Sequence, residues 1–460
     1  MSNPTLVAGV DCSVRSTTVS VCDAETGNVV RRGRAEHSDD TPGAWYQALL
    51  RACHGLLEGV HAISVAARPR RLVTLDTERA VLRSMSPFDD APCAETGEAL
   101  VVEAGGPKAW AEAVGSVPGP DSTVTRLRRF ARRAPDTAKR VRDVMLPHDW
   151  LTWRLAGEPE QAMTDRGDAS NTGYFCAATN EYRRDLVELA FGRDVELPEV
   201  VDPARIVGRT PTGAVVAAGT GHNMAAALGI GADVGDVVVS LGTRGTVFAV
   251  SNTATFDATG RVCGFADATG RHLPLVQSLN CSRVLDGTAA LLGVDLRELD
   301  RLARAADSGA AGLTMLPYIE GERTPNIPYE AGSLHGMTVA NLTPANLARA
   351  AVEGMMCGLA DGVDAIREQG VPLQRVLLVG EAARSGAVRE VAAGLFGVPV
   401  EVADPAEYVA LGAARQAAWV LSGRSTPPRW VVESSCLSAG STPDIRSRYS
   451  AAGLAAWSGA

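Results

Sequence analysis

The chain has 460 residues, of which 46% are apolar and 21% charged, and its formal net charge is −9. This length predicts two or three domains, and the composition is that of a soluble globular protein with ample apolar material for large cores. The negative charge argues against nucleic acid or an anionic membrane surface as the main partner.

Two features bear on the compartment. No apolar run approaches the roughly 18 residues of a membrane span, and the start lacks the basic segment and long apolar stretch of a signal peptide. The nine cysteines are dispersed without CxxC spacing, which favours free thiols over a disulfide framework. We therefore expect a cytoplasmic protein without a membrane partner.

The chain opens with three short strands. The apolar run LVAGV (6–10) predicts a buried strand, and TTVSVCD (17–23) and VVRRGRAE (29–36) predict two more. The polar stretches DCSVRS and AETGN separate them as turns. This order predicts a β-meander at the start of the first domain.

A similar string occupies residues 236–262. It contains an apolar strand, the small-residue turn LGTRG (241–245), a second strand TVFAVS (246–251), another turn and a third strand. We interpret the repeat as an internal duplication in which each copy opens one domain. The predicted divisions are a first domain over 1–232, a second over 233–425 and a tail with little structure over 426–460.

Helices follow the strands in both halves. Apolar residues at helical spacing predict helices within 44–59, 122–135, 183–191 and 343–370. The stretch 374–404 reads as strand, small-residue turn, helix and strand. The pattern predicts α/β architecture, in which loops at strand ends and a cleft between the duplicated units can bind a ligand.

Three loops share one design. DCSVRS (11–16), LGTRG (241–245) and VGEAARS (379–385) each follow an apolar strand and contain small residues. Such loops expose backbone N–H groups that can cradle phosphate oxygens, although any one loop taken alone favours a simple tight turn. The matching loops, one in each copy, favour phosphate binding.

Asp11 ends the first strand and begins the first of these loops. A carboxylate there can hold Mg²⁺ bound to nucleotide phosphates, because hard cations prefer oxygen ligands. The alternative is that Asp11 caps the turn with its own side chain.

Another small-residue turn, Gly219–Gly221, is followed by His222 and an Ala-rich helical stretch. A neutral imidazole there can take a proton from a hydroxyl, and a protonated one can pair with a phosphate or carboxylate. The alternative is that His222 is chemically inert.

Five motifs resemble one family in the same order along the chain. The motif GSLHGMTVANLTPANLARAAVE (332–353) fits the C-terminal signature of the FGGY family of carbohydrate kinases, most closely the xylulokinase branch. The other four are LPHDWLTWRLAG, TDRGDAS, PYIEGERTPN and EYVALGAARQAAW. The resemblance covers essentially the whole chain.

This resemblance implies two actin-like, ribonuclease-H-like ATPase domains with an interdomain cleft, in which ATP and Mg²⁺ bind and the γ-phosphate passes to a small-molecule hydroxyl. It implies catalytic roles for His222 and Asp11, with Asp11 also the metal ligand. The implied nucleotide contacts are Ser13, Arg15, Gly242, Thr243, Gly245, Gly380, Ala382 and Ala383. The implied acceptor contacts are Arg70, Arg71, Asp90 and Asn223. Dimers are common in the family, so a homodimer is one of the states open to this chain.

The chain departs from the family pattern in these same loops. His222 stands where the family carries the aspartate that acts as general base. Pro69, Arg70, Arg71 and Leu72 replace the family's Gln-His-Gly-Met, which touches the sugar. Further departures are Val14, Arg15, Pro92, Arg244, Glu381 and the segment RLRR (126–129).

These departures leave three hypotheses. The first is an ATP-dependent kinase for a sugar, polyol or modified pathway intermediate, inefficient on D-xylulose, with arginines that read a more anionic acceptor. The second is a pseudokinase that binds nucleotide or a partner without phosphoryl transfer. The third is a repurposed ATP-using biosynthetic enzyme whose acceptor is not a sugar.

Four other polar or aromatic positions are given structural roles. Trp150 and Trp153 are expected to pack from one helix face. His148 is expected to be a loop or helix-cap residue. Asp165 and Asp168 are expected to fix a loop near the cleft.

Overall fold

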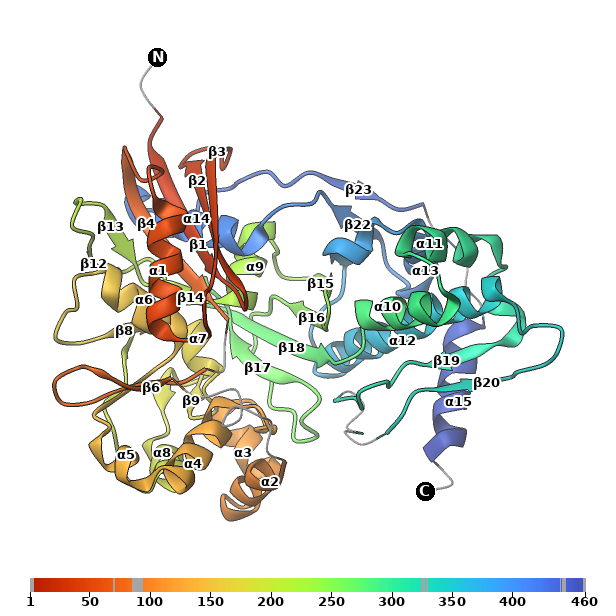
Figure 1. Cartoon of the computed structure of the whole chain (residues 1–460), viewed down its shortest axis with the longest axis horizontal. Helices are drawn as coiled ribbons and strands as arrows, with labels where there is room; N and C mark the ends of the chain where they lie inside the picture. Colours follow the sequence, from red (N-terminus) through yellow and green to blue (C-terminus); the bar gives the residue numbers. More distant parts are fainter. Residues whose placement is uncertain are drawn as a thin grey trace. The chain divides into compact units, whose positions relative to one another are not determined.

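The computed structural model divides the chain into two compact units, drawn as ribbons in Figure 1. Unit 1 comprises residues 1–232, 252–274 and 406–432, and unit 2 comprises residues 233–251, 275–405 and 433–460. The structure describes residues 4–68, 71–84, 94–323, 327, 330–438, 440 and 444–457.

The sheet of unit 1 begins with the predicted meander. Strands β1 (Leu6–Cys12), β2 (Ser16–Asp23) and β3 (Val29–Glu36) pair antiparallel in sequence order. In β3, half-buried residues alternate with residues that are more exposed, as expected of an edge strand with one face toward solvent. β1 is buried along its whole length, which explains its continuous apolar run.

Parallel strands extend this sheet on the other side of β1. β4 (Val60–Ala67) pairs parallel with β1, and β13 (Val215–Ala217) and β14 (Thr220–Gly221) pair parallel with β4. β12 (Ile206–Arg209) closes the edge antiparallel to β13. The strand order is β12-β13-β4-β1-β2-β3.

Helices cover both faces of this sheet. Ala8 and Val10 of β1 share a core with α1 (Pro42–Cys53) and α6 (Pro147–Leu155). Val7, on the opposite face, packs with α14 (Tyr408–Ser422), which in turn packs against α9 (His222–Ile230). The alternation along β1 therefore sends successive side chains to two cores.

Trp150 and Trp153 are 5% and 3% exposed and belong to the core that α6 forms with the sheet. This confirms the expectation that both tryptophans serve packing.

The rest of unit 1 is built from short elements around a separate apolar cluster that includes Trp110, Phe130, Tyr174 and Phe191. Its strands are β5 (Val73–Leu75), β6 (Val81–Ser84), β7 (Asp143–Met145), β8 (Met163–Asp165), β9 (Phe175–Cys176), β10 (Glu181–Tyr182), β11 (Glu199–Val201) and β17 (Cys263–Ala266). Its helices are α2 (Ala94–Glu103), α3 (Pro107–Val114), α4 (Thr123–Arg133), α5 (Pro135–Arg140), α7 (Arg166–Ser170) and α8 (Arg184–Phe191).

The sheet of unit 2 repeats the strand order of the first. β15 (Asp236–Leu241) pairs antiparallel with β16 (Gly245–Ala249), which pairs antiparallel with β18 (His272–Ser278). On its other side, β15 is followed by β21 (Arg375–Val379) and β22 (Val400–Ala403) in parallel, and by β23 (Ser434–Cys436) antiparallel. The order β18-β16-β15-β21-β22-β23 matches β3-β2-β1-β4-β13-β12, which confirms the predicted duplication.

The third strand of the second copy lies later than expected. It is β18, which begins at His272, and not a segment before residue 262. The residues before 262 form a turn because the carboxylate of Asp257 accepts hydrogen bonds from the N–H groups of Thr259 and Val262.

The helices of unit 2 include the long predicted one, α12 (Pro344–Glu368), which begins at the side-chain cap Thr343. The others are α10 (Ser282–Leu292), α11 (Leu296–Ala305), α13 (Gly386–Leu395), α15 (Ile445–Trp457) and the 3₁₀ turns η1 (Ala310–Gly312) and η2 (Glu381–Arg384). Two short strands, β19 (Thr314–Leu316) and β20 (Ser333–His335), form a hairpin.

The region 426–460 holds more structure than expected, since it carries β23 and α15. α15 buries Ile445 and Tyr449, and the hydroxyls of Tyr449 and Tyr318 lie 2.8 Å apart. The sequence did not predict this helix, because it consists largely of small and polar residues and its few buried side chains form no clear apolar stripe.

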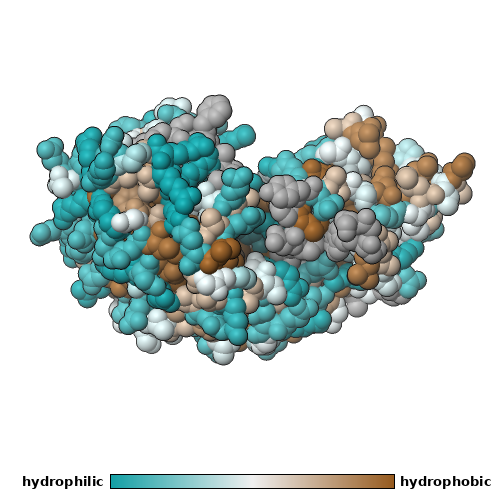
Figure 2. All heavy atoms as spheres, turned by 90° about the horizontal axis from the view of Figure 1, so that it is seen from below, coloured by the Kyte–Doolittle hydropathy of each residue, from teal (hydrophilic) through white to brown (hydrophobic). Residues whose placement is uncertain are grey.

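The surface is predominantly polar on the face drawn in Figure 2, where apolar residues are scattered among hydrophilic ones. Among the described residues, the helices are all too short or too polar to cross a membrane.

Backbone contact between α9 and α14 gives the first prediction. A Cβ added to Gly412 would lie 1.8 Å from the carbonyl oxygen of Ala225, and one on Gly229 would lie 1.9 Å from that of Tyr408. We expect Gly412→Ala to lower the free energy of unfolding by about 3 kcal/mol, because the helices must separate. Gly43→Ala is the control, since its Cβ meets nothing within 4 Å. Equal urea midpoints for the two variants would contradict this packing.

Candidate functional site

Neighbouring parallel strands of unit 1 end together, and their ends carry the predicted catalytic residues. Cys12 of β1 and Gly221 of β14 both lie opposite Ala67 of β4, on its two sides. Asp11 precedes Cys12, and His222 follows Gly221 as the first residue of α9. The structure places His222 Nε2 3.8 Å from Asp11 Oδ1. The carboxyl ends of parallel strands are the usual place for a ligand site in an α/β sheet.

Asp11 is an unusual carboxylate because it is only 7% exposed. Burial raises its pKa above the usual value, and nearby Glu407 raises it further, while His222, Ser13 and Arg34 oppose this effect. Both carboxylate oxygens accept a hydrogen bond from the Ser13 hydroxyl, at 2.9 and 3.0 Å. A cation bound at Asp11 would relieve the burial of its charge, so the oxygen donors present fit Mg²⁺.

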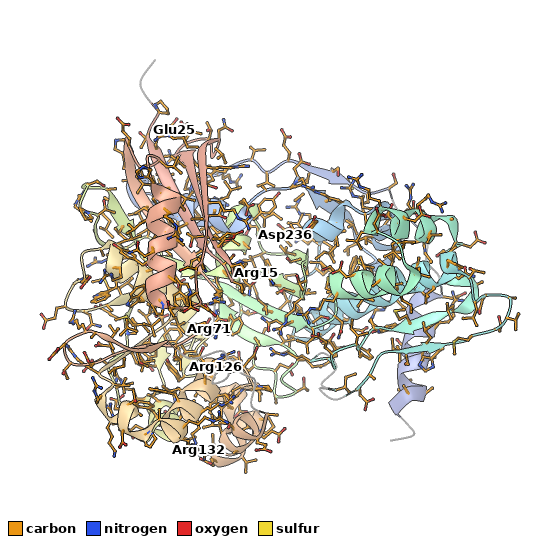
Figure 3. The ribbon with its side chains drawn as sticks, viewed as in Figure 1. Arg15, Glu25, Arg71, Arg126, Arg132 and Asp236 are labelled. Atoms are coloured by element: carbon orange, nitrogen blue, oxygen red, sulfur yellow. The ribbon has the colours of Figure 1, made fainter. Side chains whose placement is uncertain are left out.

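Two other predicted residues of unit 1, Arg15 and Asn223, lie at the same strand ends. Arg15 is exposed in the β1–β2 turn, where Figure 3 labels it. Asn223 is half-buried as the second residue of α9. Arg70 and Asp90 lie outside the described residues.

A cationic wall follows β4. The guanidinium groups of Arg68 and Arg71 both pair with Asp40, and Arg68 also lies 5.5 Å from the ring centroid of Trp45. Burial lowers the pKa of Arg68 to about 10, with a further contribution from Arg71, and burial also lowers the pKa of Arg71. The backbone N–H of Arg68 donates to the carbonyl of Cys12 at 3.2 Å, so this wall adjoins the loop after Asp11.

Unit 2 contains a cavity of about 770 Å³ at the corresponding strand ends. The loop after β15 contributes Gly242 and Thr243, and the loop after β21 contributes Glu381 and Ala382. The remaining lining residues are Leu241, Ser282, Leu285, Asp286, Leu296, Arg297, Leu299, Asp300, Val352, Arg384 and Ser385. Its volume lies within the range of about 300–1,000 Å³ that is typical of small-molecule sites.

Three residues of unit 2 that were predicted to contact nucleotide do not line this cavity. Gly245 is buried, and a Cβ there would lie 2.5 Å from Leu359 Cδ2. Gly380 has a φ of +98°, and its Cβ would lie 2.6 Å from the carbonyl oxygen of Leu241. Ala383 is 2% exposed. These residues are packed against the rest of unit 2 and support the loops that line the cavity, because a larger side chain would not fit at these positions.

Sequence reasoning missed the α10 and α11 side of the cavity. Leu285, Asp286, Leu296 and Arg297 belong to ordinary amphipathic helices, and only their packing beside the two loops makes them lining residues. The only indication in the sequence was that α10 and α11 follow the strands of the second copy.

His148 is neither a loop nor a cap residue, which corrects the sequence expectation. It lies fully buried in the first turn of α6, and the capping role belongs to Asp149, whose Oδ2 accepts from the Leu146 N–H at 2.7 Å. Asp165 caps α7 and accepts a hydrogen bond from Thr220 Oγ1 at 2.7 Å, so it fixes a loop as expected.

Comparison with known proteins covers nearly the whole chain. The N-terminal and C-terminal domain models of the FGGY family of carbohydrate kinases match residues 6–240 and 237–421. Xylulose kinase of Streptomyces rubiginosus is 40% identical over 437 residues, which are 91% of this chain and 88% of that protein.

Solved structures agree with these matches. The xylulose kinase of Bifidobacterium adolescentis superposes with a TM-score of 0.90 at 40% identity, covering 98% of this chain and all of that one. Plasmodium falciparum glycerol kinase, at 15% identity and a TM-score of 0.80 over 98% of each chain, shows the shared fold alone. The predicted pair of actin-like, ribonuclease-H-like units is therefore confirmed, and the chain belongs to the FGGY family of carbohydrate kinases.

Proposed function

We propose that this carbohydrate kinase transfers the γ-phosphate of ATP to a hydroxyl of a sugar or polyol, with Asp11 as the Mg²⁺ ligand and His222 as the general base. The observation that carries the proposal is the 3.8 Å separation of His222 Nε2 and Asp11 Oδ1 at the strand ends of unit 1. Bound Mg²⁺ would neutralise phosphate charge during transfer.

The roles of the chain's own groups follow from their chemistry. His222 is 35% exposed, so an acceptor hydroxyl can reach its ring and give up a proton to Nε2 as the oxygen attacks phosphorus. The cavity in unit 2 receives the nucleotide, whose phosphates meet the N–H groups of the Gly242–Thr243 turn. Arg68 and Arg71 then form part of the acceptor wall.

The acceptor is the open part of this proposal. The xylulose kinase names of the relatives put D-xylulose first among candidates. The substitutions at 69–72 predict a different preference, because two guanidinium groups held on Asp40 offer a cationic surface rather than neutral sugar contacts. We therefore expect D-xylulose to be a poorer acceptor than another polyhydroxylated compound, and an anionic substituent to improve binding.

ADP release measured with a panel of pentuloses, polyols and sugar acids tests the proposal. At least one compound should stimulate ADP formation well above the acceptor-free rate. If ATP binds and every compound leaves the rate unchanged, the chain is a nucleotide-binding module and phosphoryl transfer is excluded.

Blocking the unit 2 cavity gives a second prediction. Ala382→Phe places an aromatic ring among the lining residues and should weaken nucleotide binding tenfold or more, because the ring occupies ligand volume. Ala305→Phe, at the exposed end of α11, is the matched control. Titration calorimetry with ADP measures both, and equal affinities would place the nucleotide elsewhere.

A further inference from the structure

Four ionisable side chains lie in the interior of unit 1, directly beneath the turn that precedes His222. His148, Asp165 and Asp168 are fully buried and Asp149 is 3% exposed. His148 Nδ1 lies 2.8 Å from Asp168 Oδ2 and 3.1 Å from Asp149 Oδ1. Among the described residues, the hydrogen bonds and ion pairs of these four side chains do not include Asp11, His222, Arg68 or Arg71.

The ring of His148 also contacts the backbone. Its Nε2 lies 3.2 Å from the carbonyl oxygen of Ala218. A carbonyl oxygen can only accept, so Nε2 donates, and Nδ1 donates to the Asp168 carboxylate. Burial alone would lower the pKa of His148, but Asp149, Asp168 and Asp165 outweigh it and raise the pKa to about 10. The ring is therefore an imidazolium that bridges a carboxylate and one peptide carbonyl.

The turn sits on this cluster at successive residues. After Ala218, a Cβ on Gly219 would lie 2.6 Å from His148 Cδ2, so the backbone and the ring are in direct contact. Thr220 Oγ1 donates to Asp165 Oδ2 at 2.7 Å. Gly219 has a φ of +78° and Gly221 follows two residues later, so the segment has little conformational preference of its own.

We propose that His148 is a positioning residue for phosphoryl transfer: held by Asp168, it fixes the Ala218 carbonyl so that the turn presents His222 beside Asp11. This inference rests on the proposed function. The turn contains two flexible glycines, so the contacts of Ala218 and Thr220 with buried charged groups are what hold it in one conformation. This matters because displacement of a catalytic group by about 1 Å can cost 10²-fold in rate.

His148→Gln is the informative variant. Its amide N–H groups can still donate to the Ala218 carbonyl and to Asp168, but more loosely than a rigid ring. His148→Leu would remove the hydrogen-bond donors as well as the cation, so the three buried carboxylates would keep neither and folding would be compromised. We expect His148→Gln to lower kcat about 10-fold, with the KM for ATP unchanged within about twofold.

A double-mutant cycle with His222→Ala separates positioning from general stability. If His148 acts through His222, His148→Gln should have less than about a twofold effect on kcat once His222 is alanine. An equal loss in both backgrounds, or no loss in the wild-type background, would overturn the inference.

Thr220→Val provides a variant that keeps the imidazolium. It removes the hydroxyl that Asp165 accepts and should show the same dependence on His222, whereas the exposed control Thr212→Val should not change kcat. If Thr220→Val lowers kcat equally with and without His222, the turn has no positioning role.

Nitrogen-15 NMR of the histidine rings tests the contacts of His148 independently of activity. A protein that phosphorylates no acceptor would refute the proposed function but would leave this test open. His148 should keep protons on both nitrogens from pH 6 to pH 8.5, and His148→Gln should shift the His222 resonances. A bare nitrogen on His148 would overturn the inference. A stoichiometric metal in purified Asp11→Asn would also overturn it, because the candidate ligand residues His148, Asp149 and Asp168 remain in that variant and would then bind a cation instead.

Discussion

Asparagine in place of Asp11 is expected to lower acceptor-dependent ADP formation by on the order of 10²–10³-fold, because an amide cannot neutralise charge on a phosphate-bound cation. The effect should fall mainly on kcat at saturating Mg²⁺ and ATP. Asp11 is buried at the end of β1 with its oxygens directed by Ser13, so the variant changes the charge while keeping the shape. Initial rates from a coupled ADP assay measure the change.

Asp39→Asn is the matched control, because Asp39 is exposed in unit 1 and its carboxylate accepts only from the neighbouring Asp40 N–H among the described contacts. It should retain activity within about twofold. Full activity of Asp11→Asn would show that the metal and the phosphates are held without this carboxylate.

Asp11→Asn should be more stable than the wild-type protein when EDTA removes divalent cations. Burial raises the pKa of Asp11 in the folded state, so at pH values between the unfolded and the folded pKa the folded chain binds more protons than the unfolded chain. The free energy of unfolding therefore falls as pH rises through this interval. Asparagine removes this charge. The gain in Tm should grow as pH rises above about 4 and should vanish at lower pH, where Asp11 is protonated in both states.

The sheets of both units could be predicted because their signal is local. In β1 and β15, continuous apolar runs reflect strands buried on both faces, and small residues mark the turns that follow. The duplicated strand order was visible because each copy keeps the same sequence of strand and turn. Asp11 and His222 could be assigned to one site only through the resemblance, since 211 positions separate them in the chain and parallel pairing through β4 brings them together.

The rest of the site depends on contacts that leave no periodic mark. The α10–α11 wall of the unit 2 cavity consists of residues that also suit an ordinary helix surface. His148 looked like a cap because it follows Pro147 at a helix start, but the helix rotates it into the interior, where Asp168 lies 20 residues away in the chain. A buried charge cluster is defined by its partners, and these partners come from separate elements.

The second large effect is expected at His222. His222→Ala should lower kcat by about 10²-fold or more, because general-base catalysis contributes roughly 10²–10⁴-fold. The KM for ATP should stay unchanged, because the cavity proposed for the nucleotide lies in unit 2. His61→Ala is the matched control, since His61 is exposed near the start of β4, at the opposite end of the strand from Ala67. Comparable losses in the two variants would argue against a catalytic role.

The variant His222→Asp distinguishes the effect of the general base from the effect of the cationic wall. His222→Asp introduces the carboxylate that the family resemblance implies at this position. It should keep turnover on the best acceptor within about tenfold of wild type, with repulsion from Asp11 as its main cost. The variant should not improve turnover of D-xylulose, because Arg68 and Arg71 remain paired with Asp40 in the segment proposed to contact the acceptor. Values of kcat/KM for D-xylulose in the two proteins decide this point. A large gain in His222→Asp would show that the imidazole, and not the cationic wall, limits the reaction with that sugar.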